Sequence, residues 1–340
     1  MTPWRLATAL AVAVITTGVA ATPAGATEAG RIVELVAADG TLRVVFQADG
    51  LPDGVAVDPK SVVVQVNGEI VDSDAEPLLD GTTKVSRTAV LAIDNSRSMA
   101  GEPLAAAKAA ATTFLSGLPE DVTVGLVTFG DTAEVTVPAT PDRARVQAAI
   151  DDLTLDDTVG TALFDAVARA ADATGDHGAR NVLLLTDGNE DGSSDLTLDG
   201  AVGRATDDGV AVGAVYIGED GQQPPELTQL IGDAGGQVVT AGTDDLASAF
   251  ADFAQAISTQ LVVKAPVRLG TSGNVLVSGR AGDVTISDGA FLAASGRVAP
   301  QADYGPRAVE RGDGGGLLTE TSLPYVIGTL FVGLVALLYL

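Results

Sequence analysis

The hydrophobic positions in the middle of the chain fall into short continuous runs that predict buried strands. Such runs, each bounded by turn or helix-start residues, cover residues 88–93, 122–129, 182–185 and 210–217. Strands that are apolar throughout are typical of a parallel sheet covered on both faces. Two shorter runs predict an antiparallel edge strand at 133–137 and a last strand at 237–240.

Apolar residues at helical spacing separate these runs. Pro103 lies at a first helical position, and Thr140-Pro141 opens a second helix. The three clearest stripes are Leu104, Ala107, Ala111, Phe114 and Leu118; Val146, Ile150 and Leu153; and Leu246, Phe250, Phe253 and Ile257. Strands that alternate with helices predict the α/β class, with a doubly wound, mostly parallel sheet over residues 87–260.

Residues 27–86, before this unit, carry strand signals and no helical period. The dipeptides Asp39-Gly40 and Asn67-Gly68 each follow an apolar run and favour hairpin turns. Residues 261–295, after the unit, return to short strands, with a further turn expected at Asp288-Gly289. Each flank alone is too small to be stable. We therefore predict that the two flanks form one β-sandwich into which the α/β unit is inserted.

The beginning of the chain carries a targeting signal. Residues 1–26 combine Arg5, an apolar stretch and the small-residue pattern Ala24-Gly-Ala26. This combination is typical of a secretory signal peptide, which we exclude from the fold. An uncleaved membrane helix is the alternative, but the apolar stretch is short for a span.

The C-terminal residues predict a membrane anchor. Residues 323–340 are apolar, with Tyr325 and Tyr339 near their ends, as in a transmembrane helix with interfacial anchors. Residues 296–322 are rich in Gly, Pro and charge and predict a stalk. We expect a cell-membrane protein with an extracytoplasmic body and a cytoplasmic C-terminus. No basic flank follows the span, so we expect the full protein to extend beyond Leu340.

Composition narrows the classes of function. The formal net charge is −26, which argues against nucleic-acid binding because that needs a basic face. The chain has no cysteine, which excludes disulfides, thiol catalysis and cysteine-based zinc sites. Hydrophobic residues make up 46% but aromatic residues only 4%, so the core must be built from aliphatic side chains.

Oxygen-bearing side chains occur where two predicted strands end and where one helix begins. Asp94, Ser96 and Ser98 follow the first buried run, and Asp187 follows a later one. Thr161 opens a predicted helix. Hard oxygens in one tight loop suit a small hard cation such as Mg²⁺, and the carboxyl ends of strands meet at one edge of a doubly wound sheet. The alternative is that these residues only cap helices, as Asp and Ser often do.

The order D-x-S-x-S, then G-T, then T-D-G resembles the metal-ion-dependent adhesion site of von Willebrand factor type A domains. The resemblance covers roughly residues 87–259. It implies one site for Mg²⁺ or Mn²⁺, with Ser96, Ser98 and Thr161 in direct or nearly direct contact with the metal. It implies that Asp94 and Asp187 act partly through water. An open coordination position would then take a carboxylate from a partner protein.

These observations predict a membrane-anchored, extracytoplasmic domain for metal-dependent protein binding, without enzyme activity. The alternative is the N-terminal part of a bacterial protein of the type II secretion F, or tight-adherence pilus assembly, class. In that case the domain would be an envelope-side assembly module. Further apolar spans beyond Leu340 would favour the assembly machine, and a short basic tail would favour a simple anchored binder. A metal-dependent hydrolase is a third alternative.

Several residues near the predicted site have more than one interpretation. Arg97 departs from the resemblance, since glycine is usual there, and it either faces an acidic partner or is a solvated loop residue. Residues 187–192 match the opening of a calcium loop. Its twelfth position is Leu198 and lacks the required carboxylate, so we expect no independent Ca²⁺ site. His177, the only histidine, is expected at the surface.

Overall fold

The computed structural model describes residues 29–52, 54–207, 209–219, 221–293, 298–299 and 310–311. The predicted signal peptide and membrane span lie outside these residues, and the predicted stalk is described only at residues 298–299 and 310–311. Among the helices in the described ranges, none has the length and apolar character needed to cross a membrane.

A six-stranded sheet forms the centre of the α/β unit, in the order β11-β10-β9-β6-β7-β8. Its strands are β6 (Arg87–Asp94), β7 (Val122–Phe129), β8 (Ala133–Thr140), β9 (Ala179–Thr186), β10 (Ala211–Ile217) and β11 (Val238–Ala241). All neighbours are parallel except β8, which pairs with β7 in the antiparallel sense. The predicted mostly parallel sheet with an antiparallel edge strand is confirmed.

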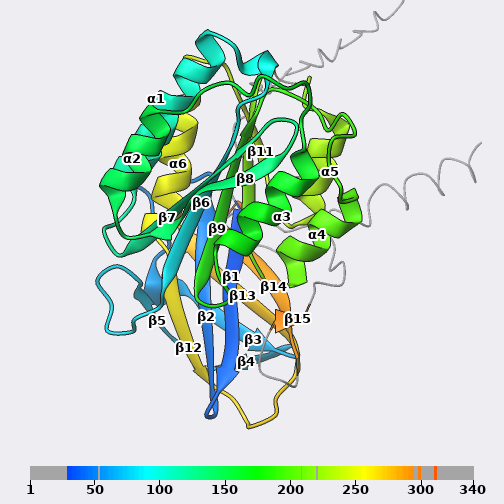
Figure 1. Ribbon diagram of the computed structural model, residues 1–340. Helices are drawn as coiled ribbons and strands as arrows, with labels where there is room; N and C mark the ends of the chain where they lie inside the picture. Colours follow the sequence, from blue (N-terminus) through cyan, green and yellow to red (C-terminus); the bar gives the residue numbers. More distant parts are fainter. Residues whose placement is uncertain are drawn as a thin grey trace, which may run out of the picture.

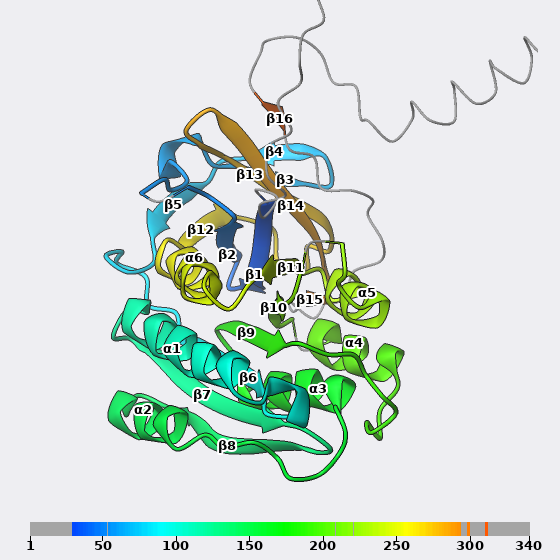
Figure 2. The same cartoon turned by 90° about the horizontal axis from the view of Figure 1, so that it is seen from above.

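Helices cover both faces of this sheet (Figure 2). One face carries α1 (Glu102–Gly117), α2 (Arg143–Asp151) and α6 (Leu246–Ser258), and the other carries α3 (Leu163–Ala173), α4 (Leu198–Asp207) and α5 (Pro225–Asp233). Successive side chains of a strand point to opposite faces, so β6 serves both cores. Leu91 and Ile93 pack under the first layer of helices, and Val90 and Ala92 under the second.

Two smaller antiparallel sheets lie below the α/β unit (Figure 1). The first has the order β1-β2-β12-β5 and consists of β1 (Ala29–Ala38), β2 (Thr41–Asp49), β12 (Leu261–Pro266) and β5 (Asp74–Pro77). The second has the order β15-β14-β13-β3-β4 and consists of β15 (Val298–Ala299), β14 (Val284–Leu292), β13 (Gly273–Ala281), β3 (Val63–Val66) and β4 (Glu69–Val71). The short strand β16 (Glu310–Arg311) also pairs with β14. Strands from both sides of the α/β unit share each sheet, and the two sheets share one hydrophobic core.

The turns of these sheets test the sequence signals. Asp39 and Asn67 both have positive φ angles, of 52° and 54°, and each begins the hairpin turn that was predicted. The turn expected at Asp288-Gly289 is wrong, because both residues lie inside β14. Asp288 is buried, and its carboxylate accepts a hydrogen bond from Ile32 N (2.7 Å), where β1 is bulged. Asp288 therefore binds a backbone N–H group of the neighbouring sheet and does not form a turn.

The α/β unit meets the first small sheet at the amino-terminal ends of β9 and β10. Ala179 and Ala211 are the first residues of these strands and pack against three valines of that sheet, Val33, Val45 and Val262. The carboxyl-terminal ends of the central strands therefore lie at the opposite end of the α/β unit, away from both small sheets (Figure 1).

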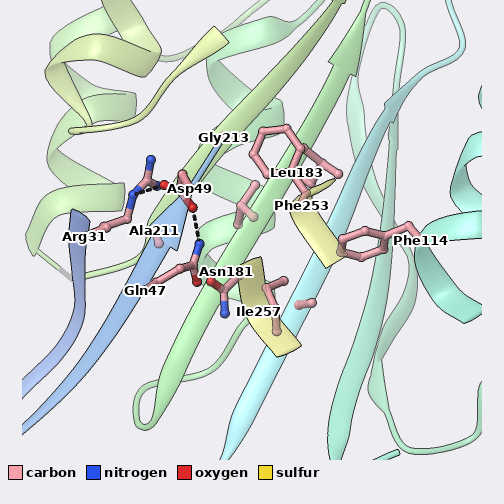
Figure 3. A pocket seen from close by; sticks show the side chains of 12 residues that line it. Arg31, Gln47, Asp49, Phe114, Asn181, Leu183, Ala211, Gly213, Phe253 and Ile257 are labelled. Carbon is pink, nitrogen blue, oxygen red and sulfur yellow. Dashed lines mark hydrogen bonds and ion pairs between the residues drawn. The ribbon is translucent and has the colours of Figure 1, made fainter. Parts of the chain in front are cut away.

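A buried polar network crosses this seam. Arg31 on β1 forms an ion pair with Asp49 (3.1 Å) and donates a hydrogen bond to Val212 O of β10 (2.9 Å). Gln47 donates to Asp49 (2.6 Å), and Gln260 donates to Gln47 (2.7 Å). Figure 3 shows Arg31, Asp49 and Gln47 beside a cavity of about 20 Å³. The hydrogen bond from Arg31 to Val212 O joins the small sheet to the α/β unit, and Asp49, which pairs with Arg31, in turn accepts a hydrogen bond from Gln47.

Candidate metal-binding site

The candidate site lies where the connections of the central sheet diverge. Strands β6 and β9 are neighbours, but the chain leaves β6 through α1 toward β7 and leaves β9 through α4 toward β10, on the other side. Ligands of open α/β sheets bind in the crevice outside such a switch point. Asp94 is the last residue of β6, and Asp187 directly follows β9. The sheet topology therefore brings these two carboxylates to one crevice.

Asp94 is completely buried, and both of its carboxylate oxygens accept hydrogen bonds. Oδ1 accepts from Ser96 N (2.8 Å), and Oδ2 accepts from the Thr186 hydroxyl (2.6 Å). Burial raises the pKa of Asp94 to about 6, although the hydrogen bonds from Ser96 and Thr186 oppose this effect. The nearby charge of Asp187 raises the pKa further. A cation at this place would favour the charged form of Asp94.

The two serine hydroxyls continue from Asp94 toward solvent. Ser96 Oγ lies 3.0 Å from Ser98 Oγ, and Ser98 Oγ donates to Asp187 Oδ1 at 2.7 Å. Ser96 is buried, whereas Ser98 is exposed. A single turn of 3₁₀ helix, Arg97–Met99, holds this loop, and the buried side chain of Met99 anchors it to the core. Oxygens from the ends of two strands are thus joined by direct hydrogen bonds.

Thr161 lies just before α3 and is mostly buried. The sequence predicted that it opens this helix, but the helix begins two residues later, at Leu163. A Cβ atom added to Gly188 would lie 3.9 Å from Thr161 Oγ1, so the hydroxyl lies beside the residue that follows Asp187. Within the described ranges, the hydroxyl makes no hydrogen bond to the other four predicted donors. The structure therefore links Asp94, Ser96, Ser98 and Asp187 directly and places Thr161 next to them.

Sequence reasoning missed three residues that hold this arrangement. Thr186 orients Asp94, as described above. Asp191 accepts a hydrogen bond from Thr161 N (3.1 Å), and Glu190 accepts from Phe164 N (3.3 Å) at the start of α3. Glu190 and Asp191 belong to the stretch that matches the opening of a calcium loop, and here both carboxylates accept hydrogen bonds from backbone N–H groups. Their only signal in the sequence is the acidic run after Asp187.

The chemistry of the donor set fits Mg²⁺ or Mn²⁺. The five side chains offer two carboxylates and three hydroxyls, and magnesium prefers oxygen ligands and usually keeps several waters. In the described part of the chain, no group of three or more His, Asp and Glu side chains is placed to hold a metal. The candidate site does not depend on such a group, because most of its donors are hydroxyls.

Residues 89–190 match a family model described as von Willebrand factor type A domain. The matched residues include all five predicted donors. A comparison with curated proteins finds no match.

Several solved structures are similar in fold. The conserved hypothetical protein BatB from Bacteroides thetaiotaomicron is 22% identical, with 51% of this chain and 97% of that chain covered and a TM-score of 0.43. A von Willebrand factor type A protein from Catenulispora acidiphila is 16% identical, with 78% and 72% covered and a TM-score of 0.48. Proximal thread matrix protein 1 from the mussel byssus, solved with a zinc-occupied MIDAS motif, is 17% identical, with 57% and 50% covered and a TM-score of 0.45.

Proposed function

We propose that the von Willebrand factor type A domain of this chain binds a divalent cation, Mg²⁺ or Mn²⁺, and through it a partner protein. Asp94, Ser96, Ser98, Thr161 and Asp187 would hold the metal. The bound metal would supply an electrophilic centre with an open coordination position, and a carboxylate of the partner would fill that position. The proposed activity is binding without catalysis.

One observation carries this proposal. Ser96 Oγ, Ser98 Oγ and Asp187 Oδ1 lie in a row with separations of 3.0 and 2.7 Å, at the point where the connections of the sheet diverge. With hydroxyls as the direct ligands, and with Asp94 and Asp187 acting partly through water, a divalent cation would keep much of its charge. Such a cation stays attractive to a further carboxylate, which a site made only of carboxylates would repel.

The position of the site suits a partner of protein size. The exposed hydroxyl of Ser98 and the half-buried carboxylate of Asp187 open to solvent at the end of the α/β unit that is farthest from the small sheets. The sequence pattern supports an extracytoplasmic location, with residues 1–26 as signal peptide and 323–340 as membrane anchor. The predicted division into residues 27–86, 87–260 and 261–295 then places a binding domain above a membrane-proximal β unit.

Titration calorimetry with Mg²⁺ tests the metal site directly. Asp94→Ala should abolish binding, because it removes one of the two carboxylates that would hold the metal. The circular dichroism spectrum should stay unchanged. Asp176→Ala is the matched control, because it removes a carboxylate from a loop at the opposite end of the α/β unit. Unchanged affinity in Asp94→Ala would exclude this assignment.

Capture from envelope extracts tests the partner. Binding should require Mg²⁺ and should fail with EDTA, in Ser96→Ala and in Asp187→Ala alike. Capture that survives EDTA and both substitutions would show that the partner binds elsewhere.

A further inference from the structure

The two residues between the donors of the D-x-S-x-S loop contact the segment that leads to Thr161. Asn95 Nδ2 donates a hydrogen bond to Thr154 O (3.0 Å), and Asp156 N donates to Asn95 O (2.7 Å). The guanidinium of Arg97 donates to Asp157 O. The loop that carries two serine donors is therefore fastened to the loop that carries the threonine donor.

A second set of contacts holds Thr161 from the other side. Asp191 Oδ1 accepts hydrogen bonds from Thr161 N (3.1 Å), Ser193 N (3.2 Å) and Ser193 Oγ (2.7 Å). In addition, Ala162 N donates to Gly130 O (2.7 Å). Since Asp191 follows Asp187 in the same loop, the threonine donor is also fastened to the loop of the fifth donor.

The loops meet too closely for Thr161 to shift without disturbing these contacts. A Cβ atom on Gly160 would lie 2.9 Å from Asp131 Cα, and one on Gly130 would lie 2.9 Å from Asp156 Cβ. Real Cβ atoms essentially never come so close to another heavy atom. Only glycine fits at these two positions, so the loops around Thr161 are closely packed.

We propose that Arg97 and Asp191 are positioning residues that hold the backbone that carries the Thr161 hydroxyl and thereby set the preference of the site for Mg²⁺ over Ca²⁺. This inference rests on the proposed function. Mg²⁺ requires near-ideal octahedral geometry at short distances, whereas Ca²⁺ accepts longer and more variable ones. A donor that is held loosely therefore weakens Mg²⁺ binding more than Ca²⁺ binding.

This role differs from both interpretations of Arg97 at the sequence level. Arg97 is exposed, and its guanidinium also donates to a carbonyl group of its own chain, a contact that neither interpretation included. Asp191 differs in the same way from a calcium ligand, because its Oδ1 accepts three hydrogen bonds from its own chain.

Titration calorimetry of the full chain with Mg²⁺ and with Ca²⁺ tests the proposal. Arg97→Ala and Asp191→Ala should each weaken Mg²⁺ binding roughly tenfold, as expected for residues that orient ligands, and Ca²⁺ binding much less. Asp191→Asn should keep most of the Mg²⁺ affinity, because all three hydrogen bonds go to one oxygen that asparagine retains. Arg97→Lys should restore part of it.

Two controls separate position from charge and from general damage. Asp195→Ala removes a carboxylate from the loop that also carries Asp191. In the described residues, the carboxylate of Asp195 accepts no hydrogen bond from Thr161. This variant should therefore leave the ratio of Mg²⁺ to Ca²⁺ affinity unchanged. In a Thr161→Ala background, Arg97→Ala and Asp191→Ala should cause no further loss of Mg²⁺ affinity, because they act through Thr161.

The outcomes distinguish this inference from the proposed function. If the unsubstituted chain binds no Mg²⁺, both are wrong. If it binds Mg²⁺ but the two alanine variants keep its selectivity, only the positioning role is wrong. Losses of Mg²⁺ affinity that add fully to that of Thr161→Ala, or a loss of Mg²⁺ selectivity that Asp195→Ala reproduces, also overturn the positioning role.

Discussion

At the scale of single residues, the site is built on a carboxylate that is buried before any cation is bound. Asp94 ends a strand whose eight residues are all buried, so its charge lies where solvation is poor. Two hydrogen bonds, from Ser96 N and the Thr186 hydroxyl, offset only part of that cost. The pKa of Asp94, about 6, is therefore still raised, because the cost of burying its charge exceeds the effect of these hydrogen bonds. Without metal, the fold is therefore less stable when Asp94 is charged.

The stability of the metal-free protein should depend on the charge of Asp94. Its pKa is raised on folding, so its contribution is most favourable below about pH 4 and is lost as the pH rises through about 6. Above that window the charge costs up to about 3 kcal/mol. In EDTA, Asp94→Asn should be more stable than the unsubstituted chain at about pH 7.5 and equal to it near pH 4. Urea denaturation at the two pH values measures this, and a difference independent of pH would contradict it.

The sequence reveals the donors better than the residues that orient them. Asp94, Ser96, Ser98 and Asp187 follow buried runs, and strand ends in a doubly wound sheet converge by rule. The role of Asp191 depends on the path of an irregular loop, and no periodicity describes such a path. In the sequence, Asp191 is only part of an acidic stretch, and nothing there indicates that its carboxylate accepts a hydrogen bond from Thr161 N.

At the scale of elements, hairpin turns and buried strands are predictable because their signals are local. Asn67-Gly68 forms its turn because asparagine and glycine tolerate positive φ. Asp288-Gly289 carries a similar signal but lies within a strand, because the carboxylate of Asp288 satisfies a donor on β1. Only the contact between sheets decides this, and the sequence does not show it. The buried network around Arg31 and Gln260 is hidden for the same reason.

Arg87 joins the first strand of the α/β unit, β6, to its last helix, α6. Its side chain is completely buried, and it donates hydrogen bonds to Ile257 O near the end of α6 (3.1 Å) and to Asp121 Oδ2 (3.0 Å). Asp121, by contrast, remains half exposed. The two partners are therefore unequal, because only the arginine depends on the pair for compensation of its charge.

We expect Asp121→Ala to destabilise the protein by about 3–5 kcal/mol, because it leaves a buried arginine without its carboxylate. Arg87→Met should cost less, about 1–3 kcal/mol, because Asp121 can be solvated and mainly the carbonyl of Ile257 loses a partner. The double variant should resemble Arg87→Met. Urea denaturation gives all three values, and a larger loss in Arg87→Met than in Asp121→Ala would contradict this account.

At the scale of the whole molecule, negative charge gathers around the candidate site. The four segments that surround it, residues 95–101, 130–132, 152–162 and 187–197, contain Arg97 as their one basic residue. Their acidic residues are Asp131, Asp152, Asp156, Asp157, Asp187, Glu190, Asp191 and Asp195. Hydrogen bonds from Thr158 and Ser193 lower the pKa values of Asp156 and Asp191, respectively. This negative potential attracts cations in general.

Metal affinity should therefore fall as salt is added. Between about 0.02 and about 0.2 M NaCl, screening shortens the reach of the surrounding carboxylates, and Mg²⁺ affinity should drop several-fold. Asp157→Asn combined with Asp195→Asn should lower both the affinity at low salt and its dependence on salt. Calorimetry at the two salt concentrations measures this effect, with Asp176→Asn as control. An affinity that does not respond to salt would show that these charges are irrelevant to the site.

The connections between the units determine how mechanical load would pass through the molecule. The chain leaves α6 directly into β12, which lies between β2 and β5 and runs away from the α/β unit (Figure 1). A pull on the rim of the candidate site, resisted beyond the small sheets, would act along β12. Its hydrogen bonds to both neighbours would then have to break together by sliding, rather than one after another from an end. A load along β12 therefore meets the hydrogen bonds of both neighbouring strands in shear.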